Sequence, residues 1–183
     1  MKLFLSAISS PLGEMLLVTD AQAWVRALEF ADHRARLHRG LRTRCGTFEL
    51  IKAPAPAAIA GALSRYFEGE LGALEEIVVA TGGSDLQRQV WEALRRIPAG
   101  QTIGYGELAR TLGFQDPRAA IDIGAANGAN PIAVIVPCHR VIASNGDLKG
   151  YAWGVQRKRW LLEHEGTLTN VVEAPEIRRL PGF

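Results

Sequence analysis

The stretch PIAVIVPCHR occupies residues 131–140, and the fold and chemistry of the chain can be read outward from it. An apolar run ends at Cys138, and His139 follows at once. A thiol beside an imidazole is typical of a reactive cysteine, because the thiolate is the nucleophile and a histidine can accept its proton. Neighbours in a regular element point apart, so His139 would reach the sulfur across a turn or through one water. The pattern alone also fits an inert buried cysteine with a chance histidine neighbour.

Length and composition set the frame for this stretch. The chain has 183 residues, of which 48% are apolar and 22% charged, as in a globular protein of one large domain or two small ones. The formal net charge is only +2, but the basic residues are clustered along the sequence. Such clusters suit a polyanion, and they fit solvated helical faces equally well.

The cysteine count and the apolar runs indicate a compartment. There are two cysteines, Cys45 and Cys138, far apart in sequence, which is not a disulfide framework. Cys45 lacks metal-ligand spacing, so we expect no metal site. The apolar start is broken by serines and Pro11, and no run reaches the length of a membrane span. We expect a cytoplasmic protein with no membrane partner.

The first half alternates short apolar segments with turn residues. Residues 3–8, 14–19 and 24–30 are predicted as strands of an antiparallel meander, and residues 57–68 as a helix. The sequence ATGGS at 80–84 then indicates a linker. We therefore predict two domains, residues 1–80 and 81–183.

The second half has helical texture. Helices are predicted from Ser84 or Asp85 to Ile97, over 105–112, and over 118–128 after Asp116-Pro117. Two short helices joined by a glycine-containing turn are compatible with a helix-turn-helix. The third helix is rich in Ala and Gly, which allow a close approach either to the protein core or to a DNA groove.

Four separated motifs now resemble one family. Asn130-Pro131, the hexapeptide PCHRVI at 137–142, Gly150-Tyr151 and LLEHEG at 161–166 resemble the O6-alkylguanine-DNA alkyltransferases in order and spacing, with the layout of the bacterial Ogt type. The resemblance extends from about Gln87 to Gly166. It implies an α/β amino-terminal domain of ribonuclease H-like fold, followed by a mainly α domain with a helix-turn-helix.

The resemblance also implies a reaction. An alkyl group on guanine O6, or less favourably thymine O4, moves irreversibly to the cysteine sulfur, and each molecule acts once. Cys138 is then the nucleophile, His139 the water-bridged base, and Glu165 the group that orients His139. Asn130 would hold the turn behind Cys138. No cofactor is implied, and we expect a monomer in solution.

The implied partner is double-stranded DNA carrying O6-alkylguanine, bound through the minor groove with the damaged nucleotide rotated out of the stack. The residues expected to line the base pocket are Tyr105, Val141, Tyr151 and Ala152. The residues expected to contact DNA are Arg118, Ala119, Ala120, Ile121, Gly124, Ala125, Asn127 and Arg140.

One position departs from the family pattern. The family carries an arginine early in the recognition helix, which fills the gap left by the rotated base. Here Ile121 stands at that position with Asp122 beside it, and Arg118 lies one turn earlier. Either Arg118 replaces the missing side chain or Ile121 acts as an apolar wedge. We expect weaker duplex binding than in typical relatives, or another lesion context, because a cation is lost and a carboxylate is added.

Two other functions remain open at this point. An alkyltransferase-like protein would bind the lesion without repairing it, but such proteins lack the reactive cysteine, whereas Cys138 is present. A thiol hydrolase or redox protein is disfavoured, because the sequence supplies no evident oxyanion site or resolving cysteine.

Overall fold

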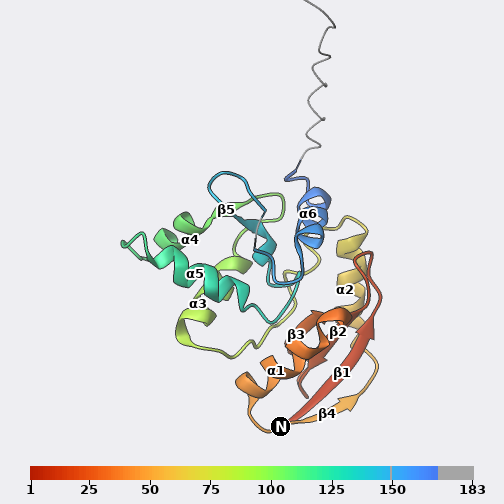
Figure 1. The fold of residues 1–183 in the computed structure, drawn as a ribbon. Helices are drawn as coiled ribbons and strands as arrows, with labels where there is room; N and C mark the ends of the chain where they lie inside the picture. The colour runs from red at the N-terminus through yellow and green to blue at the C-terminus, as the bar shows by residue number, and fades with distance from the viewer. Residues whose placement is uncertain (149, 169–183) are drawn as a thin grey trace, which may run out of the picture.

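The structure is a computed structural model that describes residues 1–148 and 150–168 (Figure 1). Its strands and helices, in chain order, are β1 (Lys2–Ile8), β2 (Met15–Thr19), β3 (Val25–Phe30), a 3-10 turn (Ala31–His33), α1 (Arg34–Cys45), β4 (Glu49–Lys52), α2 (Ala57–Phe67), α3 (Asp85–Arg95), β5 (Ile103–Gly104), α4 (Tyr105–Thr111), α5 (Ala119–Gly128), a second 3-10 turn (Cys138–Arg140), β6 (Val141–Ile142) and α6 (Val155–His164).

The amino-terminal sheet contains the predicted meander and one strand more. Strands β1, β2 and β3 pair antiparallel in sequence order, which confirms the three predicted strands. The prediction did not include β4, which adds to β1 in parallel and gives the order β3-β2-β1-β4. With only four residues, β4 was too short to stand out by alternation.

Helices cover both faces of this sheet. All five residues of β2 are buried, as expected for a central strand packed on both sides. Its Leu16 and Val18 pack in one cluster with Leu37 and Leu41 of α1, and its Met15 and Leu17 join the larger core that α2 enters. The sequence did not predict α1, because its only buried residues are the two leucines and five arginines hide the apolar stripe.

The carboxy-terminal half has the three predicted helices, with ends shifted by one or two residues. Helix α3 begins with a capping box in which the Ser84 side chain accepts from the backbone of Gln87, and the Gln87 side chain accepts from the backbone of Ser84. Helix α3 also supports α5, since the Trp91 indole N–H donates to the carbonyl of Ala126 at 2.9 Å. Helix α6 was not predicted; it packs Leu161 and Leu162 inward.

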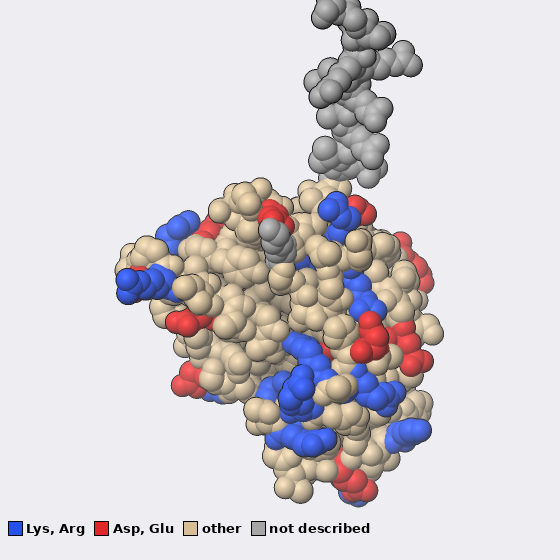
Figure 2. Space-filling model, in the orientation of Figure 1, with Lys and Arg blue, Asp and Glu red and all other residues tan. Residues whose placement is uncertain are grey.

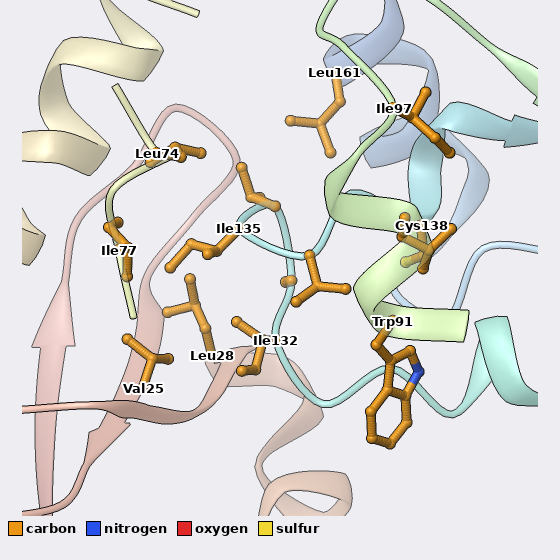
Figure 3. Close-up of a cluster of buried hydrophobic side chains, with 14 of the residues drawn as sticks. Val25, Leu28, Leu74, Ile77, Trp91, Ile97, Ile132, Ile135, Cys138 and Leu161 are labelled. Atoms are coloured by element: carbon orange, nitrogen blue, oxygen red, sulfur yellow. The ribbon is translucent and has the colours of Figure 1, made fainter. Parts of the chain in front are cut away.

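One core runs through both halves (Figure 3). Leu28 of β3 pairs with the apolar run from the second half, donating to Pro131 O at 3.0 Å and accepting from Ala133 N at 2.8 Å. This run forms no strand beyond that bridge, and Val134 has φ +65°, a left-handed conformation that is rare for a β-branched residue. The turn at Val134 redirects the chain from the sheet toward Cys138. Among residues 1–148 and 150–168, no helix has the length and apolar character to cross a membrane.

Candidate active site

Asn130 closes the loop that carries the cysteine. Its amide N–H group donates to the carbonyl of Val136 at 2.7 Å and to Cys138 Sγ at 3.2 Å. Its side-chain oxygen accepts from the backbone N–H of Ile132 at 2.9 Å. Asn130 is fully buried, so these bonds form away from competing water. The Asn130 side chain thus holds the two ends of the apolar run, at Ile132 and Val136, and also the sulfur of Cys138.

The 3-10 turn at Cys138–Arg140 sends its side chains in different directions. Cys138 is 2% exposed, and its sulfur faces Asn130, while His139 and Arg140 face the end of α6. Within the described residues no direct hydrogen bond joins Cys138 to His139, in accord with the expectation that neighbours in sequence point apart. Any proton transfer between them would need an intervening atom.

Glu165 is the centre of a buried polar network. Its Oε1 accepts from the Tyr66 hydroxyl at 2.6 Å and from Arg140 Nη2 at 2.8 Å, and lies 2.9 Å from His139 Nε2. Its Oε2 accepts from Arg140 Nε at 2.9 Å. Burial alone would raise the pKa of Glu165, but the bonds from His139 and Arg140 hold that pKa far below its ordinary value. The carboxylate therefore stays ionised.

The protonation states of the neighbouring groups follow from burial. Burial lowers the pKa of His139, against the pull of Glu165, so the imidazole is neutral at neutral pH. The bond to the carboxylate then assigns the proton to Nε2 and leaves Nδ1 as an acceptor. Burial raises the pKa of Cys138 to about 11, so the resting sulfur is a protonated thiol. The site thus pairs a protonated nucleophile with a neutral base.

Two further residues belong to this site and were not found from the sequence. Lys158 of α6 is fully buried and donates from Nζ to the carbonyl of Val141 at 2.7 Å. Its positive charge acts to lower the pKa of Cys138. Tyr66 reaches the network from α2. The only signal for either was the inward face of its helix, which by itself indicates packing.

Several polar atoms around the thiol have no partner. Among residues 1–148 and 150–168, these are His139 Nδ1, Tyr151 Oη and Asn127 Oδ1, all buried. Burial raises the pKa of both Tyr151 and Tyr105, so both phenols remain neutral donors. Unpaired buried polar groups are costly, and at a site they mark places where a ligand or water completes the bonding.

The predicted base-pocket residues lie around the thiol in different ways. Tyr105 begins α4 and packs on the glycine face of α5, where a Cβ on Gly124 would lie 3.8 Å from its ring. Val141 is buried and Ala152 is half-buried. Cys138 and Tyr151 belong to one hydrophobic core cluster, and Tyr105 packs against it. Cys138 interacts electrostatically with both tyrosines, and Asn127 forms a hydrogen bond with Tyr105.

The predicted DNA-contact residues divide into two groups. Ile121 is 74% exposed, and Arg118, Asp122 and Ala125 are exposed with it, while Ala119, Ala120 and Gly124 are half-buried. Two predicted contacts do not lie on this surface. Asn127 lies on the buried face of α5, and Arg140 is 7% exposed with its guanidinium bonded to Glu165 and to Ile97 O. The structure places Arg140 away from the outer face of α5, with its charge paired to the buried carboxylate of Glu165.

A partly buried ion pair connects the sheet to the site. Arg36 of α1 pairs with Glu29 of β3, and its Nη2 donates to Gly128 O at 2.9 Å and to Asn130 O at 2.8 Å. Glu29 also accepts from the Trp153 indole. The sequence did not indicate these contacts, which join residues about a hundred positions apart. Among the described residues, no group of three or more His, Cys, Asp or Glu side chains could hold a metal ion.

Comparison with known proteins gives a consistent result. Residues 85–167 match the family model described as 6-O-methylguanine DNA methyltransferase, DNA binding domain. The chain is 47% identical over 170 residues to the methylated-DNA–protein-cysteine methyltransferase of Salmonella typhimurium, covering 92% of this chain and 98% of that protein. It is 42% identical to the protein of the same name from Mycobacterium tuberculosis, covering 86% and 89%.

Solved structures agree over most of the chain. The crystal structure of the Mycobacterium tuberculosis O6-methylguanine methyltransferase superposes with a TM-score of 0.74 at 36% identity, covering 92% of this chain and 96% of that one. The structure of the Mycobacterium tuberculosis protein in complex with DNA gives a TM-score of 0.73 at 36% identity, covering 88% and 92%. The chain belongs to the methylated-DNA–protein-cysteine methyltransferase family.

Proposed function

We propose that this protein repairs DNA by direct reversal, moving an alkyl group from O6-alkylguanine, and less readily from O4-alkylthymine, to Cys138. The observation that carries the proposal is the buried thiol held by Asn130 beside the His139–Glu165 pair in a chain of this family. In the transfer, a sulfur–carbon bond forms as the carbon–oxygen bond breaks. The electron pair stays on the base, which takes up a proton and becomes normal guanine.

The proton inventory supports this sequence of events. The thiol is protonated at neutral pH and needs a base, and His139 Nδ1 is an unpaired acceptor. A single water between them would carry the proton. The ionised Glu165 stabilises the imidazolium that forms, and the charge of Lys158 favours the thiolate. The product is a thioether, which none of these groups can hydrolyse, so each molecule acts once.

Access to the base requires that α4 and α5 act as a helix-turn-helix in the minor groove. Rotating a nucleotide out of the stack costs a few kcal/mol. The half-buried Ala119, Ala120 and Gly124 of α5 favour a close approach to DNA. Tyr105, Tyr151, Val141 and Ala152 would surround the rotated base, with the free Tyr151 hydroxyl available as a donor.

The remaining features of the proposal concern the chain as a whole. The sheet with helices on both faces supports a ribonuclease H-like assignment for residues 1–80, with residues 81–183 as the alkyltransferase domain. The predicted end of this second domain, from 169 to 183, lies outside the described residues. We infer that the protein acts as a monomer in the cytoplasm, and that its partner is double-stranded DNA carrying the lesion.

Intact-mass spectrometry tests the proposal. After incubation with a duplex containing one O6-methylguanine, the protein should gain one methylene, and the gain should stop at one equivalent. Cys138→Ala should abolish the gain, and Cys45→Ala, which removes the other cysteine, should leave it unchanged. A protein that binds the lesion but never gains mass would be a lesion marker, and the proposal would fail.

A further inference from the structure

Helix α1 carries several arginines that take no part in the alkyl transfer. Its sequence, RARLHRGLRTRC, holds five arginines and no acidic residue. Leu37 and Leu41 fix the inward face against the sheet, so the arginines fall on the flanks and the outer face. Figure 2 shows Lys and Arg side chains gathered where Figure 1 places α1.

The arginines of α1 have different tasks. Arg36 is neutralised by Glu29, and Arg44 is partly buried, with its pKa lowered by burial. Arg39 and Arg42 are exposed, line one shallow hollow with His38, and form no ion pair within residues 1–148 and 150–168. Arg34, at the start of α1, is exposed as well, but it lines a separate hollow beside Glu14 and Lys52. Arg39 and Arg42 are therefore the two exposed cations of α1 that share one hollow and can bind a ligand together.

The placement of α1 relates these cations to the recognition helix. Arg36, in the first turn of α1, is bonded to the carbonyls of Gly128 and Asn130 at the end of α5. From Arg36, α1 rises about 1.5 Å per residue, which places Arg42 on the order of 10 Å further along. The hydrogen bonds of Arg36 thus link the helix that carries these cations to the end of the recognition helix.

A duplex seated on α5 would extend past that helix. The ten residues of α5 span about 15 Å, whereas one turn of B-DNA is about 34 Å long. The outer face of α5 itself carries Ile121 and Asp122, which supply no positive charge. Arg118, at the amino-terminal end of α5, is the exposed cation next to this face, so further cations elsewhere on the protein would strengthen binding to the flanking phosphates.

We propose that Arg39 and Arg42 of α1 form a second DNA contact, which binds backbone phosphates of the duplex that flanks the lesion site. The inference rests on the proposed function for the location of the duplex. The contact reads no sequence, because a solvent-exposed arginine pair on phosphates positions the protein without touching base edges. It offsets the charge that α5 lacks.

Salt-dependent binding of the full chain tests this contact. Fluorescence anisotropy with an undamaged duplex of about 24 base pairs should give a log K against log salt slope that is smaller by about 1.8 in the Arg39→Gln/Arg42→Gln double variant, since each phosphate contact contributes about 0.9. The charge-preserving Arg39→Lys/Arg42→Lys variant should keep most of the slope. Lys52→Gln/Arg159→Gln removes two exposed charges on β4 and α6 and should leave it unchanged.

The length of the probe and the transfer reaction separate the possible failures. With a duplex of about 10 base pairs, the wild type and the double Gln variant should bind alike. At saturating methylated duplex, both should transfer the methyl group at the same rate. An unchanged slope on the long duplex would overturn the α1 contact while leaving methyl transfer intact. Absence of transfer in the wild type would overturn the proposed function, while the slope difference would still report on α1.

Discussion

The active-site loop, residues 130–140, and the outer face of α5 are neighbours in the chain and opposites in construction. In the loop, Asn130, His139 and Arg140 are buried and each is held by bonds to the protein. On the outer face of α5, Ile121 and Asp122 are exposed, and neither has a partner among the described residues. The loop is held in place by contacts within the protein, whereas the outer face of α5 is free to contact another molecule.

This difference predicts how each region responds to change. A buried polar network loses both bonding and charge balance when one member is removed, so the losses are large and affect folding as well as chemistry. An exposed face away from such features tolerates substitution within about 0.5 kcal/mol, and its changes appear in binding. A substitution of the same kind should therefore lower the free energy of unfolding in the loop and change DNA binding on the outer face of α5.

The largest effect should come from Glu165→Gln. The change leaves the buried guanidinium of Arg140 without its counter-charge, and breaking a buried pair in this way costs about 3 to 5 kcal/mol. Urea unfolding should show that loss, together with the loss of methyl transfer. Glu163→Gln, two residues earlier and exposed on α6, is the control and should stay within about 0.5 kcal/mol. Equal stability of the two variants would show that the network does not hold the loop.

Asn130→Ala should rank second. It leaves the Ile132 N–H unpaired in the interior, at about 1 to 3 kcal/mol, and removes one of the two donors to the Val136 carbonyl, which still accepts from Cys138 N at 2.9 Å. It also removes the donor to Cys138 Sγ, so the pKa of the thiol should rise above its present value of about 11. A pH titration of thiolate absorbance measures that shift. Asn145→Ala, in an exposed turn, is the matched control, and a thiol that titrates as in the wild type would contradict this role.

The sequence predicted the two regions unequally. The residues of the loop could be named, because PCHR, Asn130 and Glu165 occur in a recognisable order, and the predicted strands and helices around them were found. Tyr66, Arg36 and Lys158 could not be named, because their roles depend on contacts between elements far apart in the chain. Their residue types and spacings resemble those of any packed helix.

Helix α1 and Arg140 show two ways in which such reading fails. Helix α1 was missed because its apolar stripe is two leucines wide and its other residues resemble a basic loop. Arg140 was placed among the DNA-contact residues, and the sequence did not indicate that it is 7% exposed and bonded to Glu165, because a local motif does not report burial.

An intermediate effect should appear in the pH dependence of stability. The pKa of His139 is lowered in the folded protein, so below about pH 6.5 the unfolded chain binds a proton that the folded one refuses. The free energy of unfolding should therefore fall with decreasing pH from that point, by up to about 1.4 kcal/mol per unit. His139→Gln should remove this slope, and His38→Gln on α1 should retain it. Urea titrations between pH 7 and 5 measure the difference, and parallel curves for wild type and His139→Gln would contradict the assignment.

The smallest effect on folding, and the sharpest test of the outer face, should come from Ile121→Arg. Ile121 is 74% exposed, so the change should alter the free energy of unfolding by less than about 0.5 kcal/mol. It adds a cation where a duplex is proposed to lie, and the slope of log K against log salt for an undamaged duplex should steepen by about 0.9.

Arg118→Ala distinguishes the two alternatives for the missing arginine. A loss of affinity for duplex but not for single strands indicates that Arg118 replaces the missing side chain. No loss indicates that Ile121 acts as a wedge. If wild type, Ile121→Arg and Arg118→Ala repair duplex and single-stranded substrate equally, then α5 does not set DNA affinity. The proposed role of its exposed face in DNA binding would then be contradicted.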